Sequence, residues 1–252
     1  MTIEAGPKGG NGPAVLLLHG IGGRASLWQP TIDALSADHH VIAMDMRGYD
    51  GAEPALDSFS AVADAAMALL ASRGIPRADV VGHSLGGMVA LEMALRHPDH
   101  VRRLVIVASS PAFGSRDPAF RETFLAARQK PLDEGLGMAG VAAALVPTMP
   151  GPAADPGAVP AAIAAMASVD ERAYRTTLGM LTGFDRRGDL GQVTQKSLLI
   201  AGEADATAPP RGMQRMADAM PDARLVVIPG VGHLLPLEAP DAFHEVLRDF
   251  LA

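Results

Sequence analysis

The stretch that decides the fold is Val80-Val81-Gly82-His83-Ser84-Leu85-Gly86-Gly87-Met88-Val89-Ala90. A short β-branched run ends in Gly-x-Ser-x-Gly and continues at once into residues rich in Ala, Leu and Met. This order predicts a strand, a tight turn and a helix, with Ser84 on the turn. Glycines at positions 82 and 86 leave room for neighbouring backbone to pack closely around it. We therefore predict that Ser84 is an exposed nucleophile.

Two backbone N–H groups are candidates for binding the negative charge that develops on a carbonyl oxygen under attack. Leu85 is the first residue of the predicted helix, so its N–H is free to point at such an oxygen. The loop His19-Gly20-Ile21-Gly22-Gly23 follows the apolar run 14–18. Glycines directly after a buried strand mark backbone that turns sharply or approaches a ligand. The N–H of Ile21 is the second candidate, with an ordinary glycine loop as the alternative.

Strand and helix patterns alternate over the first hundred residues and again near the end of the chain. The predicted strands cover residues 14–18, 40–44, 79–81, 101–108, 197–201 and 224–228. The predicted helices cover residues 26–37, about 58–72, 85–96 and 241–251, and another opens at Pro209-Pro210. Continuous apolar strands suit a mostly parallel sheet with helices on both faces, and ligand chemistry in such α/β sheets lies at the carboxyl ends of the strands. Asp45–Gly51, at one such end, is expected to be a structural turn.

Residues 112–187 interrupt this alternation. They contain no convincing strand, only Ala-rich helical segments such as 118–129 and 161–168, separated by several prolines. We predict a helical cap at 112–187, inserted over the strand ends of a core formed by 1–111 and 188–252. The Ala/Pro/Gly-rich stretch 149–160 fits either an ordered or a mobile loop. The turn formers of 6–13 leave space for at most one short strand before Ala14.

The bulk composition favours a small-molecule ligand. The chain has 252 residues, a net charge of −7 and no basic run, so nucleic acid and anionic membrane surfaces are poor partners. The absence of cysteine excludes disulfides, thiolate nucleophiles and cysteine-ligated metals. The first residues lack the pattern of a secretory signal, and no apolar stretch reaches membrane-spanning length. We expect a soluble cytoplasmic protein.

A base and an acid follow two of the later strands. Gly202-Glu203-Ala204-Asp205 comes after the strand at 197–201, and Gly230-Val231-Gly232-His233 comes after the strand at 224–228. Both segments are expected at the sheet edge where Ser84 lies. His233 would take the serine proton, and Asp205 would orient the imidazole, with Glu203 as the alternative acid. The order Ser, Asp, His is that of α/β-hydrolase triads.

The remaining histidines are expected to have other roles. His83 neighbours the nucleophile but is predicted to point elsewhere. His19 is predicted to be a structural hydrogen-bonding residue in the glycine loop. The others are expected to be solvated: His39, His40, His97, His100 and His244.

Taken together, these motifs resemble the α/β-hydrolase superfamily, in family order across nearly the whole chain. The matching segments are His19-Gly20-Ile21-Gly22, Asp45-Met46-Arg47-Gly48-Tyr49, Gly82-His83-Ser84-Leu85-Gly86-Gly87, Gly202-Glu203-Ala204-Asp205 and Gly230-Val231-Gly232-His233. The resemblance implies an α/β-hydrolase fold, a triad of Ser84, Asp205 and His233, and an oxyanion hole from the N–H groups of Ile21 and Leu85. Segments 26–28 and 172–175 are similar to 3-oxoadipate enol-lactonases and small bacterial carboxylesterases. In the turn after Arg47-Gly48, Asp50 and Ala52 depart from the family's usual Gly and Ser.

The expected reaction is hydrolysis of a carboxylic ester or lactone through an acyl-enzyme, which needs no metal ion and no organic cofactor. The residues that could bind the substrate are Trp28 and four arginines suited to a carboxylate, Arg121, Arg128, Arg175 and Arg186. One alternative is C–C bond hydrolysis or perhydrolysis on the same triad, although His83 stands where C–C hydrolases usually carry Asn. The other is a non-catalytic receptor on a hydrolase scaffold.

Overall fold

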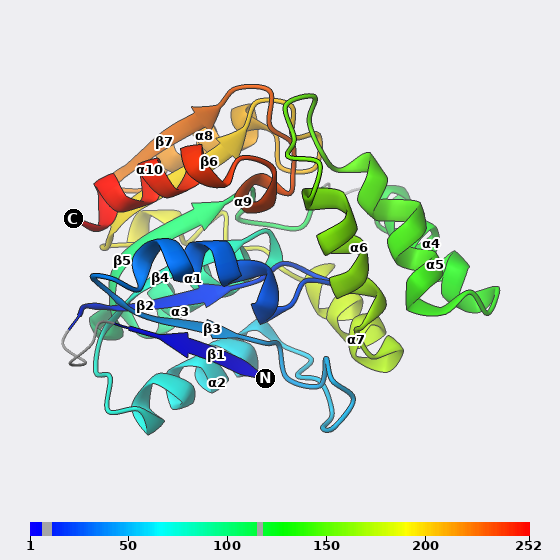
Figure 1. Cartoon of the computed structure of the whole chain (residues 1–252), viewed down its shortest axis with the longest axis horizontal. Helices are drawn as coiled ribbons and strands as arrows, with labels where there is room; N and C mark the ends of the chain where they lie inside the picture. Colours follow the sequence, from blue (N-terminus) through cyan, green and yellow to red (C-terminus); the bar gives the residue numbers. More distant parts are fainter. Residues whose placement is uncertain (7–11, 115–117) are drawn as a thin grey trace.

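One mixed sheet forms the centre of the molecule (Figure 1). The computed structural model describes residues 1–6, 12–114 and 118–252, so most of the turn-rich run 6–13 lies outside the described residues. The described strands are β1 (Thr2–Ala5), β2 (Ala14–Leu18), β3 (His40–Met44), β4 (Ala78–His83), β5 (Val101–Val107), β6 (Lys196–Gly202) and β7 (Ala223–Ile228). Their order is β1-β3-β2-β4-β5-β6-β7. Only β1 runs antiparallel to its neighbour in this described sheet, which confirms the predicted mostly parallel α/β architecture.

The strands are apolar on both faces. In β2, Leu16 and Leu18 belong to one buried cluster, whereas Val15 and Leu17 belong to another. Successive side chains of a strand point to opposite faces, so these two clusters lie on the two sides of the sheet. Both sides must therefore be covered by helices.

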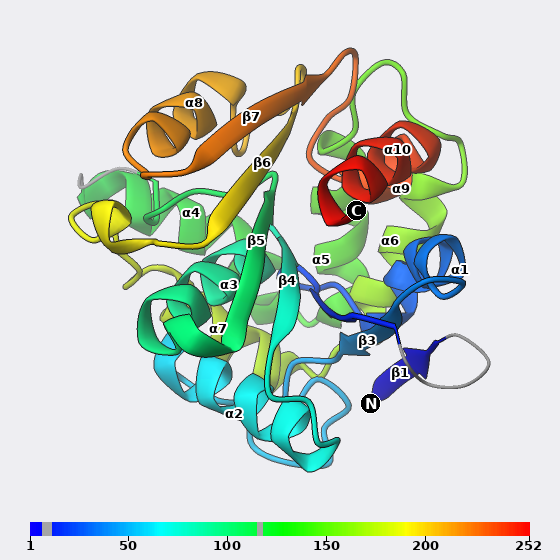
Figure 2. The ribbon, with the colours of Figure 1, turned by 90° about the vertical axis from the view of Figure 1, so that its left-hand side faces the viewer.

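Helices cover the sheet in two layers (Figure 2). On one side lie α1 (Gln29–Leu35) and α10 (Pro240–Leu251). Trp28, directly before α1, packs against Phe243 of α10, with ring centroids 6.2 Å apart. On the other side lie α2 (Phe59–Ser72), α3 (Leu85–Arg96) and α8 (Pro210–Asp218). Each layer buries one of the two apolar clusters, so the positions of the strand ends are fixed from both sides.

The helix predicted at 26–37 is divided in the structure. A 3-10 turn, η1 (Ala25–Trp28), comes first and α1 follows it. Pro30 has no N–H to donate to the carbonyl four residues earlier, so an α-helix cannot continue through this point from Ser26. At the next helix, the Ser58 hydroxyl accepts from the N–H of Ala61, which identifies Ser58 as the N-cap of α2.

His244 corrects one expectation, because it is buried rather than solvated. It lies on α10 where that helix packs against α1, and its Nε2 is 3.0 Å from the Thr31 hydroxyl. Burial lowers the pKa of His244. The apolar spacing of α10 alone did not reveal that this histidine points at the neighbouring helix.

Four helices lie beyond the carboxyl ends of the parallel strands (Figure 1). They are α4 (Pro118–Asp133), α5 (Gly137–Leu145), α6 (Ala158–Ala167) and α7 (Glu171–Leu181). Over 112–114 and 118–187 the structure contains no strand, only a single bridge between Ala112 and Asp185. The helical character predicted for this part is confirmed, and the cap boundaries at 112 and 187 stay a prediction. No helix within the described ranges is both long and apolar enough to cross a membrane.

Candidate active site

Ser84 lies on a sharp turn between β4 and α3. Its φ of 52° and ψ of −118° place a non-glycine residue in a sparsely populated region of backbone space. Such a conformation costs about 1–3 kcal/mol and persists only where the surroundings enforce it. A Cβ at position 82 would come within 2.1 Å of the Gly86 oxygen, and one at position 86 within 2.2 Å of the Leu18 oxygen. The two glycines thus permit the close packing that the motif predicts.

Neighbouring strands hold this strained turn in place. The N–H of Ser84 donates to the Val107 oxygen at 2.9 Å, and the Ser109 hydroxyl donates to the Ser84 oxygen at 2.6 Å. Both partners belong to β5 or to the loop that follows it. The serine side chain therefore has a fixed position at the carboxyl end of the sheet.

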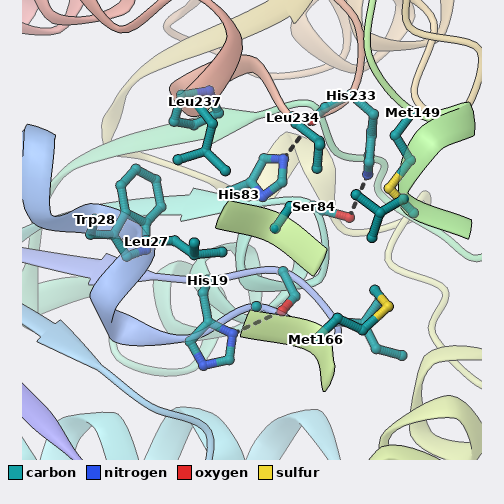
Figure 3. A pocket seen from close by; sticks show the side chains of 17 residues that line it. His19, Leu27, Trp28, His83, Ser84, Met149, Met166, His233, Leu234 and Leu237 are labelled. Atoms are coloured by element: carbon teal, nitrogen blue, oxygen red, sulfur yellow. Dashed lines mark hydrogen bonds between the residues drawn. The ribbon is translucent and has the colours of Figure 1, made fainter. Parts of the chain in front are cut away.

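Three side chains that are distant in sequence form one hydrogen-bonded chain. Nε2 of His233 lies 3.0 Å from the Ser84 Oγ (Figure 3). Nδ1 of His233 lies 2.9 Å from Oδ2 of Asp205. Asp205 follows β6 and His233 follows β7. The residues Asp205 and His233 are almost wholly buried, at 2% and 6% exposure. The structure thus brings together the three residues that the sequence motifs single out.

The environment of Asp205 keeps it ionised. Burial raises the pKa of this carboxyl, but the hydrogen bond and charge of His233 and two backbone N–H donors outweigh that effect. The net pKa lies below its ordinary value. The donors are Thr207 at 2.7 Å and Ala208 at 2.9 Å, both to Oδ1. Glu203, the alternative acid, instead accepts from the N–H of Gly230 at 2.9 Å and is exposed to solvent.

Ile21 and Leu85 line the same cavity as Ser84, and neither of their N–H groups donates to an acceptor within the described residues. His19 fixes the loop that carries Ile21. Its Nδ1 donates to the Gly20 oxygen at 2.8 Å, and its Nε2 accepts from the N–H of Met46 at 3.0 Å. Burial lowers the pKa of His19, so the ring is neutral and serves the structural role predicted for it.

The turn after β3 supports this loop from the other side. Asp45 accepts from the N–H of Ala25 at 2.5 Å and forms an ion pair with Arg24 at 2.8 Å. Gly48 and Gly51 take the left-handed backbone positions of the turn, with φ values of 86° and 75°. Because these glycines supply the left-handed conformations, the departures at positions 50 and 52 are tolerated.

Two cavities meet at Ser84. The smaller one, of about 70 Å³, lies between the His19–Gly23 loop, Trp28 and α9 (Leu235–Glu238) (Figure 3). The larger one, of about 280 Å³, lies between the end of β5 and helices α4 and α7. Both cavities are mostly apolar and share a few residues, namely Ile21, Ser84, Met149, Met166 and His233. This arrangement provides a separate space on each side of the serine hydroxyl.

The residues predicted to bind substrate occupy different places. Trp28 lines the smaller cavity and Arg128 lines the larger one. Three arginines are absent from the walls of both cavities. Arg121 is exposed on α4, Arg175 pairs with Glu171 and Asp133, and Arg186 pairs with the buried Glu92. Of the four arginines, the structure brings only Arg128 to the space beside Ser84.

Glu238 is a buried residue near the site that the sequence patterns did not reveal. Its carboxylate is 2% exposed and accepts three backbone N–H groups, those of Gly151, Gly232 and Leu234, each at 2.7 Å. Gly232 and Leu234 flank His233, and Gly151 belongs to the segment that follows the cap helix α5. This carboxylate thus joins the loop of His233 to the segment between α5 and α6. No motif marks it, because its donors are backbone groups that any residue type could supply.

His83 differs from the expectation that it points away from the site. Its Nε2–H donates to the backbone oxygen of His233 at 2.7 Å, and the two imidazole centroids are 5.3 Å apart. Burial and the nearby His233 lower the pKa of His83 to about 4, so its ring is neutral near pH 7. The sharp turn at Ser84 directs this side chain toward the loop that follows β7. His83 therefore helps to hold the backbone of His233.

Comparison with known proteins identifies the family of this chain. Residues 15–246 match the family model described as "Alpha/beta hydrolase family". "Putative carbamate hydrolase RutD" of Variovorax paradoxus is 36% identical over 96% of this chain and 92% of its own length. "Pimeloyl-[acyl-carrier protein] methyl ester esterase" of Vibrio atlanticus is 31% identical over 96% of this chain and 95% of its own.

A solved structure gives the same result at the level of the fold. The enol-lactonase from Burkholderia xenovorans LB400 superimposes with a TM-score of 0.89 at 26% identity, covering 100% of this chain and 95% of that one. The family match, the relatives above 30% identity and this structural likeness all extend over nearly the whole chain. The protein therefore belongs to the alpha/beta hydrolase family.

Proposed function

We propose that this protein hydrolyses carboxylic esters or lactones of small molecules, with Ser84 as the nucleophile. The observation that carries the proposal is the hydrogen-bonded chain from Ser84 through His233 to Asp205. A serine hydroxyl is a weak nucleophile until an adjacent base takes its proton, and the base works best when a third group fixes its tautomer. Here the ionised Asp205 faces Nδ1 of His233, which leaves Nε2 to accept the proton.

The reaction follows from these positions. Nε2 of His233 takes the proton of the Ser84 hydroxyl while Oγ attacks the substrate carbonyl carbon. The carbonyl oxygen gains a negative charge, which the N–H groups of Ile21 and Leu85 stabilise. His233 then gives its proton to the departing alcohol oxygen, and the ester of Ser84 remains. Water, activated by the same imidazole, releases the acid and restores the serine.

The relatives support ester and lactone substrates in particular. One is named as a methyl ester esterase and a structural neighbour as an enol-lactonase. The relative named as a carbamate hydrolase makes carbamates a second candidate class, since the same attack on a carbonyl carbon cleaves them. The hydrogen-bonded chain of Ser84, His233 and Asp205 favours an enzyme over a receptor, because ligand binding alone does not need an activated nucleophile.

A substrate panel tests this proposal. We expect turnover of p-nitrophenyl esters and of simple lactones in a pH-stat assay. Cleavage of the C–C bond of a diketone is expected to be much slower, and so is perhydrolysis, the formation of peracetic acid from an acetate ester and hydrogen peroxide. A p-nitrophenyl carbamate in the same panel separates the second candidate class. Purified protein that cleaves no ester, lactone or carbamate would contradict the proposal.

Replacing Glu238 by glutamine is expected to lower kcat about 10- to 100-fold and to change KM little. The amide offers one acceptor oxygen in place of two and presents its NH₂ to a backbone N–H, so the loop of His233 shifts. A displacement of about 1 Å at a reacting group costs about 100-fold in rate. Steady-state kinetics on a p-nitrophenyl ester measures both constants.

The matched control for this change is Glu245→Gln, which alters an exposed glutamate on α10. We expect it to leave both constants within about 3-fold, as is usual for surface substitutions. If Glu238→Gln raised KM while kcat stayed constant, Glu238 would act on substrate binding rather than on the position of His233.

A further inference from the structure

The Arg128 guanidinium is a cation on the wall of the larger cavity, and it has no acidic partner among the described residues. It lies on α4, its central carbon sits 3.5 Å from the Phe124 ring centroid, and Nη1 donates to the Phe124 oxygen at 3.2 Å. In the described parts of the chain, no Asp or Glu forms an ion pair with it. Burial lowers the pKa of Arg128. Its remaining N–H donors thus bind no carboxylate of the residues that the structure describes.

Tyr174 supplies a second donor on the same wall. The side chain, from α7, is almost wholly buried, and its hydroxyl forms no hydrogen bond with another described residue. Tyr174 and Arg128 both line the larger cavity. Burial raises the pKa of the Tyr174 hydroxyl, and the charge of Arg128 lowers it in part. The net shift is upward, so the hydroxyl keeps its proton and acts as a donor.

The surrounding wall is apolar. Phe113, Phe120 and Phe124 form an aromatic cluster with ring centroids between 4.9 and 6.4 Å apart. Removing a cation from water without a counter-charge is costly, and an anion bound through charge-assisted hydrogen bonds offsets that cost. A planar guanidinium matches a carboxylate through two parallel hydrogen bonds. The cavity therefore pairs an apolar channel with one anion-binding position.

We propose that Arg128 and Tyr174 bind a carboxylate on the acyl part of the substrate, which makes the preferred substrates monoesters of dicarboxylic acids or lactones whose acyl chain carries a carboxylate. This proposal rests on the proposed function, because the acyl chain must extend from the carbonyl at Ser84 into the same cavity. The cavity of about 280 Å³ holds a short carbon chain between the two ends. The smaller cavity then receives the leaving alcohol.

The test compares charged and neutral acyl chains of equal length. The substrates are the mono-p-nitrophenyl esters of adipate and pimelate, with p-nitrophenyl hexanoate and heptanoate as their neutral counterparts. Arg128→Gln is expected to lower kcat/KM for the two anionic esters by about 10- to 100-fold and to leave the neutral esters within about 3-fold. Lys130→Gln removes the same charge from an exposed position of α4 and is expected to change neither series.

Tyr174→Phe removes only the hydroxyl and is expected to lower kcat/KM for the anionic esters by about 3- to 10-fold, with no loss on the neutral ones. Equal losses on both series, or no loss for Arg128→Gln on the anionic esters, would overturn the proposal. Calorimetric titration of the Ser84→Ala protein with adipate supplies a readout without turnover. If adipate binds to the Ser84→Ala protein and the added Arg128→Gln change abolishes this binding, the anion site is supported even if no ester is cleaved. If adipate does not bind to the Ser84→Ala protein, the anion site is contradicted.

Discussion

Replacement of Ser84 by alanine is expected to lower kcat for a p-nitrophenyl ester by about five to six orders of magnitude. Removing the nucleophile of a serine hydrolase triad leaves only the contribution of the oxyanion hole and substrate binding. Because alanine has nearly the same volume and the same backbone preference, the strained turn with its φ of 52° is retained. Stopped assays over long incubations measure the residual rate, and a thermal melt checks the fold.

Ser72→Ala is the control for this change, since Ser72 is an exposed serine near the end of α2. Its activity should stay within about 3-fold of the original protein. A Ser84→Ala protein that melts normally and keeps more than about a tenth of the rate would show that another group attacks the carbonyl.

Replacement of Asp205 by asparagine is expected to lower kcat by about four orders of magnitude with a small change in KM. The asparagine amide cannot balance the charge of the imidazolium, and its NH₂ favours the tautomer of His233 with the proton on Nε2. That tautomer cannot accept the proton of Ser84. The contacts to Thr207 and Ala208 require only an acceptor oxygen, so the loop is expected to fold as before. Steady-state kinetics between pH 6 and 9 measures the loss.

The matched control is Glu203→Gln, which changes the exposed carboxylate two residues earlier. It should keep kcat within about 3-fold, because Glu203 contacts the N–H of Gly230 and not the imidazole. The reverse result, a large loss for Glu203→Gln and a small one for Asp205→Asn, would assign the acid role to Glu203.

The local chemistry of the site was predictable because it depends on short patterns. Apolar strands that each end in a functional residue must place those residues at one sheet edge, so Ser84, Asp205 and His233 were expected to meet. The structure shows their hydrogen bonds at 3.0 and 2.9 Å. The glycines at 82 and 86 were likewise recognisable from the motif, because at each position a Cβ would lie within 2.2 Å of a backbone oxygen.

Features that depend on contacts between distant segments were not predictable in this way. The position of Glu238 is defined by backbone donors from two loops, one of them between α5 and α6. The burial of His244 depends on how α10 packs on α1, and the contact of His83 depends on the path of the loop after β7. The four arginines carry the same chemistry in the sequence. Only their ion pairs and the cavity walls distinguish Arg128 from the others.

The most direct test of the central claim is mass spectrometry of the protein after reaction with a fluorophosphonate, which forms a stable bond only with an activated serine. We expect one phosphonyl group per chain, on the peptide that contains Ser84, and no labelling of the Ser84→Ala protein. We also expect much slower labelling of Asp205→Asn. Labelling at a different residue, or an ester-cleaving protein that the reagent neither modifies nor inhibits, would contradict the account.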